Sequence, residues 1–257
     1  MNYDLQKASF LKRVSAWLLD MILLVVLATG CVFVISDLIN YDVQVQKLDD
    51  CYTQYETDFN ISFDLSQEDY SAMTEEERAA YDETVNAAYK AMTNDSEVMR
   101  VYSLVIQQML LMLGIGIFLA RLLLDFVVPL LFGNGQTIGK KIFGLGVMRT
   151  NSVRISGVAL FIRSILGKYT IETMVPIFIF LMMFHGILGS IGLILLLVIL
   201  LAQILLMVAT ANNSAIHDKL SDTVVVDLPS QMIFDSPEAR VDYQQRIAAE
   251  KAEQQPY

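Results

Sequence analysis

Long apolar runs dominate the pattern of hydrophobic and polar positions along this chain. Runs of membrane length occur at about 14–36, 102–132 and 187–210, and a shorter, interrupted run covers about 157–184. A helix needs about 20 mostly apolar residues to cross a hydrocarbon core of about 30 Å. The pattern therefore predicts an all-α membrane protein with about four transmembrane helices embedded in the lipid bilayer. The composition agrees, because 54% of the 257 residues are hydrophobic.

A polar stretch, residues 37–100, separates the first two apolar runs. It contains more aromatic residues than a disordered tether would: Tyr52, Tyr55, Phe59, Phe63, Tyr70, Tyr81 and Tyr89. Thr74 and Glu77 have the spacing of a helical capping box, which predicts a helix from there through about Met92. Another helix is predicted at about 42–58. We expect a small acidic helical domain here, and a mobile acidic loop is the alternative.

The run at 157–184 is broken by charged residues and a proline. Arg163 and Lys168 occur in its first half, and Glu172 and Pro176 in its second half. An amphipathic segment lying in the membrane interface, followed by a short span, explains this pattern better than one clean helix.

Glycines recur in two further segments. Gly186, Gly189 and Gly192 recur every third residue, which predicts a helix face cleared for close packing. Between 133 and 156, glycines and alternating apolar residues predict a short strand or re-entrant segment at 142–149 and a hairpin turn at 150–152.

The expected organisation of the chain has four parts. The N-terminus and the first helix occupy 1–36, the acidic insertion 37–100, the membrane core 101–227 and a tail 228–257. The last part of the tail is either a short exposed helix or disordered.

Charge is distributed unevenly and predicts an orientation. The net charge is −10, and residues 37–100 hold sixteen acidic residues against four basic ones. The segment 133–156 instead has four basic residues and no acidic one, and the N-terminus carries Lys7, Lys12 and Arg13. Because basic residues concentrate on the cytoplasmic side of the cell membrane, we expect both termini in the cytoplasm and 37–100 outside. Three spans instead of four would place the C-terminus outside.

Asp20 is a conspicuous polar residue within the first apolar run. An ionised carboxylate in the hydrocarbon core costs about 2.5 kcal/mol or more unless a partner, a cavity or a proton compensates. Arg13 precedes it by seven residues, or about two helical turns, so both side chains fall on one helix face roughly 10 Å apart. We interpret Asp20 as a functional or pairing residue, with Arg13 as its first candidate partner.

Other charged residues complete the candidate polar network. Arg121 and Asp125 lie four residues apart in the second run, a spacing that favours an ion pair within one helix. His217 and Asp218 are adjacent after the last run, so they point to different sides and do not predict a metal site. Further candidates are Lys140, Arg163 and Glu172.

Several kinds of chemistry find no support in the sequence. The segment from Gly135 to Lys140 lacks the glycine spacing and the following Ser or Thr of a phosphate-binding loop. Neither a Ser-His-Asp arrangement nor a basic patch for nucleic acid is present, and no cofactor is expected. Cys31 and Cys51 are poorly placed to pair. We therefore do not expect an enzyme.

Three short patterns occur in a fixed order along the chain. Arg13 and Asp20 begin it, Thr137-Ile-Gly139-Lys140 follows the second apolar run, and His217-Asp218 precedes Thr223-Val-Val after the last run. Together they resemble the RDD family of membrane proteins, which is named for one arginine and two aspartates. In this resemblance Asp218 corresponds to the second aspartate.

The resemblance covers about 8–36 and 102–227, and it departs from the family in two places. The insertion at 37–100 is longer than the family leads us to expect, and no glycine stands near Asp222. The resemblance implies a role in the transport of ligands, with cations or protons among them.

Two functional hypotheses remain open. In the first, the protein is a transporter in which Asp20 binds a cation or proton in competition with Arg13, and Asp125 and Asp218 contribute on the inner side. Because four helices leave little room for a pathway, this hypothesis needs a homo-oligomer or a partner membrane protein. In the second, the charges form a structural network in a scaffold or regulatory subunit, whose acidic insertion binds a partner protein or cationic peptide.

Overall fold

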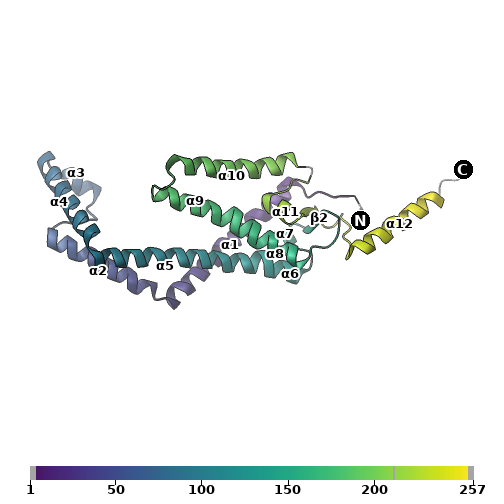
Figure 1. Cartoon of the computed structure of the whole chain (residues 1–257), viewed down its shortest axis with the longest axis horizontal. Coiled ribbons are helices and arrows are strands. Elements are labelled where there is room, and N and C mark those ends of the chain that lie inside the picture. Colours follow the sequence, from purple (N-terminus) through teal and green to yellow (C-terminus); the bar gives the residue numbers. More distant parts are fainter. Residues whose placement is uncertain (1–3, 211, 254–257) are drawn as a thin grey trace. The chain divides into compact units, whose positions relative to one another are not determined.

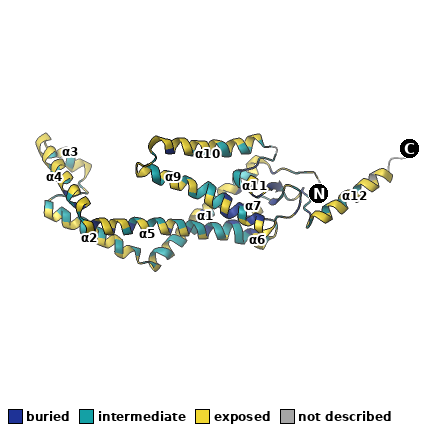
Figure 2. Cartoon of the chain, viewed as in Figure 1, coloured by how far each residue is buried: buried dark blue, intermediate teal, exposed yellow. Residues whose placement is uncertain are grey.

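The computed structural model describes residues 4–210 and 212–253, which are mostly helical (Figure 1). Within them, four helical stretches are long and apolar enough to cross a membrane, as predicted: Phe10–Leu38, Ser96–Phe132, Gly157–Phe184 and Gly189–Ala209. The shortest has 21 residues, or about 32 Å of helix, which matches a hydrocarbon core of about 30 Å. Many residues of these helices are exposed (Figure 2), and many of the exposed ones are apolar, as surfaces in contact with lipid tails would be.

The chain divides into two compact units. Gly30–Gly116 form one, and the chain up to Thr29 together with the chain from Ile117 onward forms the other. Two helices belong partly to each unit, namely α1 (Phe10–Leu38) and α5 (Ser96–Arg121). Each unit is therefore described by itself.

The smaller unit contains the two helices predicted in the polar stretch, α2 (Tyr41–Phe59) and α4 (Glu75–Asn94). A short helix that was not predicted, α3 (Gln67–Ala72), lies between them in the sequence. The predicted capping box is present, because the Thr74 hydroxyl accepts from the Glu77 amide and the Glu77 carboxylate accepts from the Thr74 amide at 2.8 Å. The Phe63 ring lies 5.8 Å from that of Tyr52 and 4.9 Å from that of Tyr89. Aromatic contacts thus join α2, α4 and the segment between α2 and α3.

The second candidate span changes its helical pitch before a proline. After α5, residues Leu122–Val127 form the π-helical segment η1, and Val128–Phe132 form α6. Pro129 has no N–H, so it cannot donate to the carbonyl of Asp125 as an α-helix requires. That carbonyl accepts a hydrogen bond from the Ser164 hydroxyl instead. The π-helical segment therefore leaves the Asp125 carbonyl as an acceptor for a side chain of the third span.

The third candidate span is one continuous helix, which corrects the expected division into two segments. It runs through α8 (Gly157–Phe161), the π-helical segment η2 (Ile162–Met174) and α9 (Val175–Phe184). The charged residues lie in η2, where several of them are buried against other elements rather than exposed to lipid. Like η1, this π segment ends shortly before a proline, Pro176.

The glycine pattern before the last span forms a turn rather than a packing face. Gly186 and Gly189 have positive φ angles of 72° and 48°, and a Cβ at either would meet nothing within 4 Å. They reverse the chain between α9 and α10 (Gly189–Ala209), which lie side by side (Figure 1). Only Gly192, among these three residues, makes a close contact, with Met183. The predicted packing face is therefore wrong.

A small antiparallel sheet qualifies the all-α prediction. It pairs β1 (Leu145–Arg149), within the predicted strand or re-entrant segment, with β2 (Thr223–Asp227). The register places Leu145 opposite Asp227 and Arg149 opposite Thr223. The predicted turn at 150–152 follows β1, and the Arg149 amide donates to the Val153 carbonyl at 2.8 Å. Before the strands come two short helices, α7 (Ile138–Ile142) and α11 (Ile216–Leu220).

The buried core of the larger unit surrounds this sheet (Figure 2). Its largest fully buried apolar side chains are Leu145, Val147, Met148, Val224 and Val226. The N-terminal segment joins the sheet through a bridge between Lys7 and Val226. Beyond the sheet, the tail forms the helix α12 (Pro237–Glu253). The sheet thus ties distant parts of the sequence together at one end of the spans.

Candidate functional site

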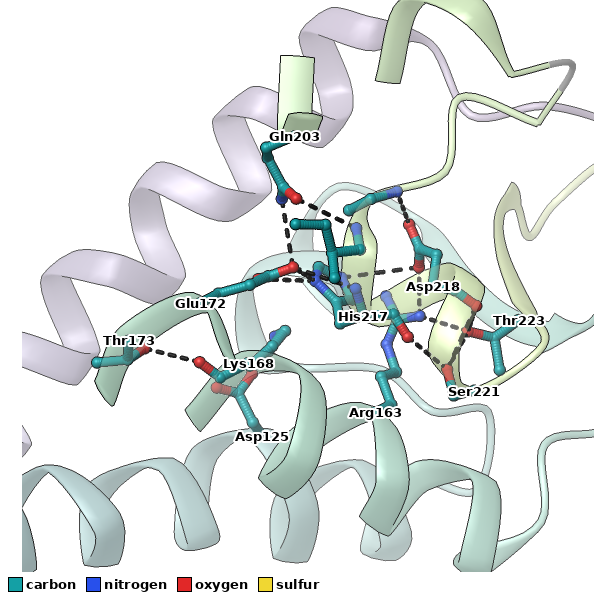
Figure 3. Close-up of polar contacts among 12 residues, drawn as sticks. Asp125, Arg163, Lys168, Glu172, Thr173, Gln203, His217, Asp218, Ser221 and Thr223 are labelled. Atoms are coloured by element: carbon teal, nitrogen blue, oxygen red, sulfur yellow. Dashed lines mark hydrogen bonds and ion pairs between the residues drawn. The ribbon is translucent and has the colours of Figure 1, made fainter. Parts of the chain in front are cut away.

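Asp218 on α11 lies between two arginines and has only 1% of its side chain exposed. Arg163 from η2 donates through Nη1 to Asp218 Oδ1, and the same nitrogen contacts Thr223 Oγ1 at 2.5 Å (Figure 3). Arg13 from α1 places Nη2 3.3 Å from Asp218 Oδ2. The Ala215 amide donates to the same oxygen at 2.8 Å. One carboxylate therefore joins the first and third spans to the sheet end of the molecule.

Asp125 on η1 forms a second cluster of the same kind. Arg121 Nη1 donates to Asp125 Oδ2 at 2.8 Å, which confirms the ion pair predicted from their spacing. Lys168 from η2 donates to Asp125 Oδ1. Arg121 also reaches Thr173 Oγ1 at 3.3 Å. The second and third spans are thus connected by one buried carboxylate and two cations.

Asp20 on α1 is held by the loop that carries α7. It accepts from the Thr137 hydroxyl at 2.5 Å and from the Gly139 amide at 2.8 Å. Lys140 Nζ lies 3.9 Å from Asp20 Oδ2 and donates to Thr137 Oγ1 at 3.2 Å. A Cβ at residue 139 would stand 2.9 Å from Asp20 Oδ1 and would also collide with the Ala16 carbonyl. Only glycine allows this approach of loop and helix.

Glu172 on η2 accepts hydrogen bonds from the last span and from α11 (Figure 3). His217 Nδ1 lies 2.8 and 2.9 Å from the two carboxylate oxygens, so this nitrogen carries the proton. The His217 amide also donates to Glu172, at 3.1 Å. Gln203 from α10 donates to Glu172 at 3.3 Å and accepts from the Ile216 amide at 3.2 Å. The fourth span is therefore part of the polar network.

These clusters surround a cavity of about 360 Å³. Its charged lining residues are the five cations Arg13, Arg121, Lys140, Arg163 and Lys168 and the two carboxylates Asp20 and Glu172. The wall also includes His217, Gln203 and apolar side chains such as Trp17 and Met207. Residues from all four candidate spans contribute to it. A charged cavity among apolar helices is the natural place for a ligand.

Outside the spans, the pKa values of three groups reflect this environment. Burial and the nearby cations Lys168 and Arg163 lower the pKa of Lys140 to about 7, despite the attraction of Asp20. Burial, with the charge of Arg163, also lowers the pKa of His217, which is therefore neutral at pH 7. Burial alone would raise the pKa of Asp218, but Arg163 and its other partners outweigh that effect and hold the pKa well below its usual value. Asp218 is a permanent anion, whereas Lys140 exchanges its proton near neutral pH.

The structure brings the candidate residues together but changes their partners. The expected pairing of Arg13 with Asp20 is corrected, because Arg13 contacts Asp218 and the Asn213 carbonyl. Asp20 instead pairs with the Thr137–Lys140 segment. His217 and Asp218 bond to different partners, Glu172 and Arg163, although His217 Nε2 also lies 3.7 Å from Asp218 Oδ1. Among the described residues, no group of His, Cys, Asp and Glu is arranged to hold a metal ion.

Two residues were missing from the predicted site. Lys168 bonds to Asp125, and Gln203 bonds to Glu172. A signal for each was present in the sequence, because a lysine inside a membrane-length helix and an amide within the most apolar span are both costly placements. Thr137 and Gly139 were noticed only as part of a family pattern, and their contacts with Asp20 give that pattern a physical reason.

The comparison with known proteins agrees with this geometry. The model of the RDD family matches residues 7–222. The chain belongs to the RDD family. Arg13 and Asp218, which correspond to the arginine and the second aspartate of the family name, contact each other across most of the sequence of this RDD protein. Neither the curated proteins nor the solved structures include a match to the chain.

The double pairing of Asp218 predicts a large effect of a small substitution. Asp218→Asn leaves the buried charges of Arg163 and Arg13 without their shared anion, so we expect the free energy of unfolding to fall by about 3 kcal/mol or more. Thermal or denaturant unfolding in detergent measures this loss. Asp222→Asn is the matched control, because its pair with Arg149 is exposed and contributes at most about 1 kcal/mol. Equal losses in the two variants would contradict the buried pairing.

The lowered pKa of Lys140 predicts a pH dependence of stability. Its pKa is about 7 in the folded protein and has an ordinary value of 10.5, so between these values the unfolded chain binds more protons. The free energy of unfolding should therefore rise with pH from 7 to 9, by on the order of 1 kcal/mol per pH unit from this group. Lys140→Gln should reduce that slope, and Lys219→Gln, at an exposed position, should not. Identical slopes in all three proteins would refute the assignment.

Proposed function

We propose that this RDD protein is a membrane carrier that moves a small charged solute through the cavity between its four candidate spans. The observation that carries the proposal is the charged wall of that cavity, to which every span contributes. Each charge placed at the centre of a bilayer costs about 2.5–3.5 kcal/mol. A purely structural bundle would be held together more simply by apolar packing. The concentration of charges around one cavity supports a ligand pathway.

The contact between Asp20 and Lys140 supplies an exchangeable element for such a carrier. Lys140 Nζ lies 3.9 Å from the carboxylate, which is longer than a direct hydrogen bond. Its pKa of about 7 means that the charge of this lysine changes near neutral pH. Protonation of Lys140 therefore alters the charge of the cavity, and this is the property that a proton-coupled carrier needs. A metal cation bound at Asp20 would have to displace this lysine.

Topology and assembly complete the proposal. The basic residues of the N-terminus and of 133–156 support a cytoplasmic location for these segments and for the C-terminal tail, with the acidic stretch 37–100 outside the cell membrane. Four helices surround only a narrow pathway. We therefore propose that the transporting form is a homo-oligomer or a complex with a partner membrane protein.

A scaffold or regulatory subunit is the second candidate function. It is favoured by the dense pairing of the charges, since Asp20, Asp125, Glu172 and Asp218 each have at least two donors. Such a network would fix the register of the helices without any ligand. The acidic helices of the smaller unit would then bind a partner protein or a cationic peptide.

Flux measurements on proteoliposomes separate the two candidates. Asp20→Asn keeps the size of the side chain but removes the charge that faces Lys140. If the protein is a carrier, we expect the flux of its solute through this variant to fall at least about tenfold. Flux is measured with pH-sensitive dye and with labelled cations and anions. Asp235→Asn is the matched control, because Asp235 is exposed and its ion pair with Arg154, at 3.0 Å, is exposed too.

Thermal unfolding of the same variants completes the test. Loss of flux in an Asp20→Asn protein that unfolds at nearly the wild-type temperature supports the carrier. Absence of flux in the wild type, together with a strongly destabilised Asp20→Asn variant, would reject the carrier in favour of the scaffold.

A further inference from the structure

The side chains that line the cavity include more cations than carboxylates. Three arginines and two lysines line it, together with two carboxylates. Even when Asp125 and Asp218 behind the wall are counted, the four carboxylates are fewer than the cations. His217 does not change this balance, because it is neutral at pH 7. With Lys140 protonated the cavity has one positive charge in excess, and with Lys140 neutral its charges balance. Below about pH 7 the cavity therefore favours an anion.

The two carboxylates of the wall are already occupied by protein donors. Asp20 accepts from Thr137 and Gly139, and Glu172 accepts from the side chain and the amide of His217 and from Gln203. A metal cation entering the cavity would have to compete with these donors. By contrast, two arginines of the wall carry N–H groups that still lack an acceptor.

Two such donors are buried in the arginines of the wall. Within the described part of the chain, Arg163 Nη2 and Arg121 Nε have no hydrogen-bond partner, and Arg163 is only 3% exposed. A buried N–H without an acceptor costs about 1–3 kcal/mol, and more in a charged group. Such groups in a native structure call for a ligand, an ion or a water. Arginine is well suited to an oxyanion, because its planar fork matches the oxygens of phosphate and carboxylate groups.

The remainder of the wall indicates what carries the anionic group. A cavity of about 360 Å³ lies within the range of sites for small organic molecules. Apolar side chains, among them Trp17, Met21 and Met207, occupy the part of the wall that the charges leave. The ligand thus has an anionic end and an apolar portion.

From these features we infer that the cavity binds an oxyanion, the phosphate or carboxylate group of a small organic solute or of a lipid headgroup, at Arg163, Arg121 and Lys140. The inference names the solute of the proposed carrier and rests on that proposal only for its movement across the membrane. Binding itself depends on the wall alone.

Binding of the anion should take up a proton at Lys140. The charged groups around this lysine are Asp20 on α1, Asp125 on η1, and Arg163 and Lys168 on η2. An anion placed among them offsets the repulsion from the two η2 cations, and so favours protonated Lys140. Affinity for an anion of constant charge should therefore fall as the pH rises from 6 to 9.

The single tryptophan of the chain provides a direct readout, because Trp17 lines the cavity. The full chain in neutral detergent is titrated with sodium sulfate, with inorganic phosphate, and with sodium chloride at matched ionic strength. We expect a saturable change in Trp17 fluorescence and a higher unfolding temperature with sulfate and phosphate but not with chloride. Sulfate is used for the pH series, since its charge is constant over that range.

Two variants assign the effect to the wall. Lys140→Gln removes one cation, and Arg121→Lys keeps a charge for Asp125 while removing Nε. Each should weaken sulfate binding by about tenfold or more, as expected for the loss of one charged hydrogen bond. Lys140→Gln should also abolish the pH dependence, and Lys140→Arg should bind without it. Lys219→Gln, at an exposed position, should bind as the wild type does.

Nanodiscs distinguish a lipid headgroup from a free solute. If phosphatidylglycerol raises the unfolding temperature over phosphatidylcholine alone and competes with sulfate in the wild type but not in Lys140→Gln, the anion belongs to a lipid. If sulfate binds equally in both membranes, the anion is a free solute.

Two results overturn the inference. One is the absence of any saturable response to sulfate, phosphate or phosphatidylglycerol, which would leave water as the partner of the arginines. The other is a saturable response to sodium that Asp20→Asn removes, which would make the cavity a cation site. Anion binding without flux in proteoliposomes would keep the site and reject the carrier.

Discussion

The buried contact of Asp218 with Arg163 and Arg13 is the interaction on which the larger unit depends. Inside a membrane protein a charge is tolerated when opposite charges and hydrogen bonds satisfy it. Asp218 meets that condition through partners from the first span, from the third span and from its own helix. Thr223, which shares Arg163 with Asp218, begins the strand β2. The spans and the sheet are therefore held at one charged point, where the loss of one residue leaves several others unsatisfied.

The π-helical segments adapt the spans to this requirement. In an α-helix the carbonyl of Asp125 would be bonded within its own helix, but Pro129 cannot donate to it, and Ser164 of the third span does so instead. The π-helical segment η2 of the third span carries Arg163, Lys168 and Glu172. These residues bond to Asp218, Asp125 and His217, respectively. Local departures from α-helical geometry thus occur where the polar network forms, as is common at functional sites.

The balance of the network connects structure with function. Carboxylates in the larger unit are surrounded by donors, whereas the arginines retain buried N–H groups that no described residue accepts. This balance supports the proposed anionic ligand more than the cation suggested by an isolated aspartate within a membrane helix. Lys140 connects this preference to protons, since its charge depends on pH in the physiological range. Asp20 bonds to the loop of α7 through Thr137 and Gly139 and also faces Lys140.

Features set by neighbouring residues were readable from the sequence itself. The four apolar spans, the helix at Tyr41–Phe59, the capping box at Thr74 and the Arg121–Asp125 pair all follow from hydropathy or from spacing within one helix. Three features were decided by tertiary packing: the choice of Asp218 as the partner of Arg13, the capture of Asp20 by Thr137 and Gly139, and the turn at Gly186 and Gly189. The physical reason is that a charged side chain at a given depth has several opposite charges within reach. Only the packing of distant segments determines which of them it meets.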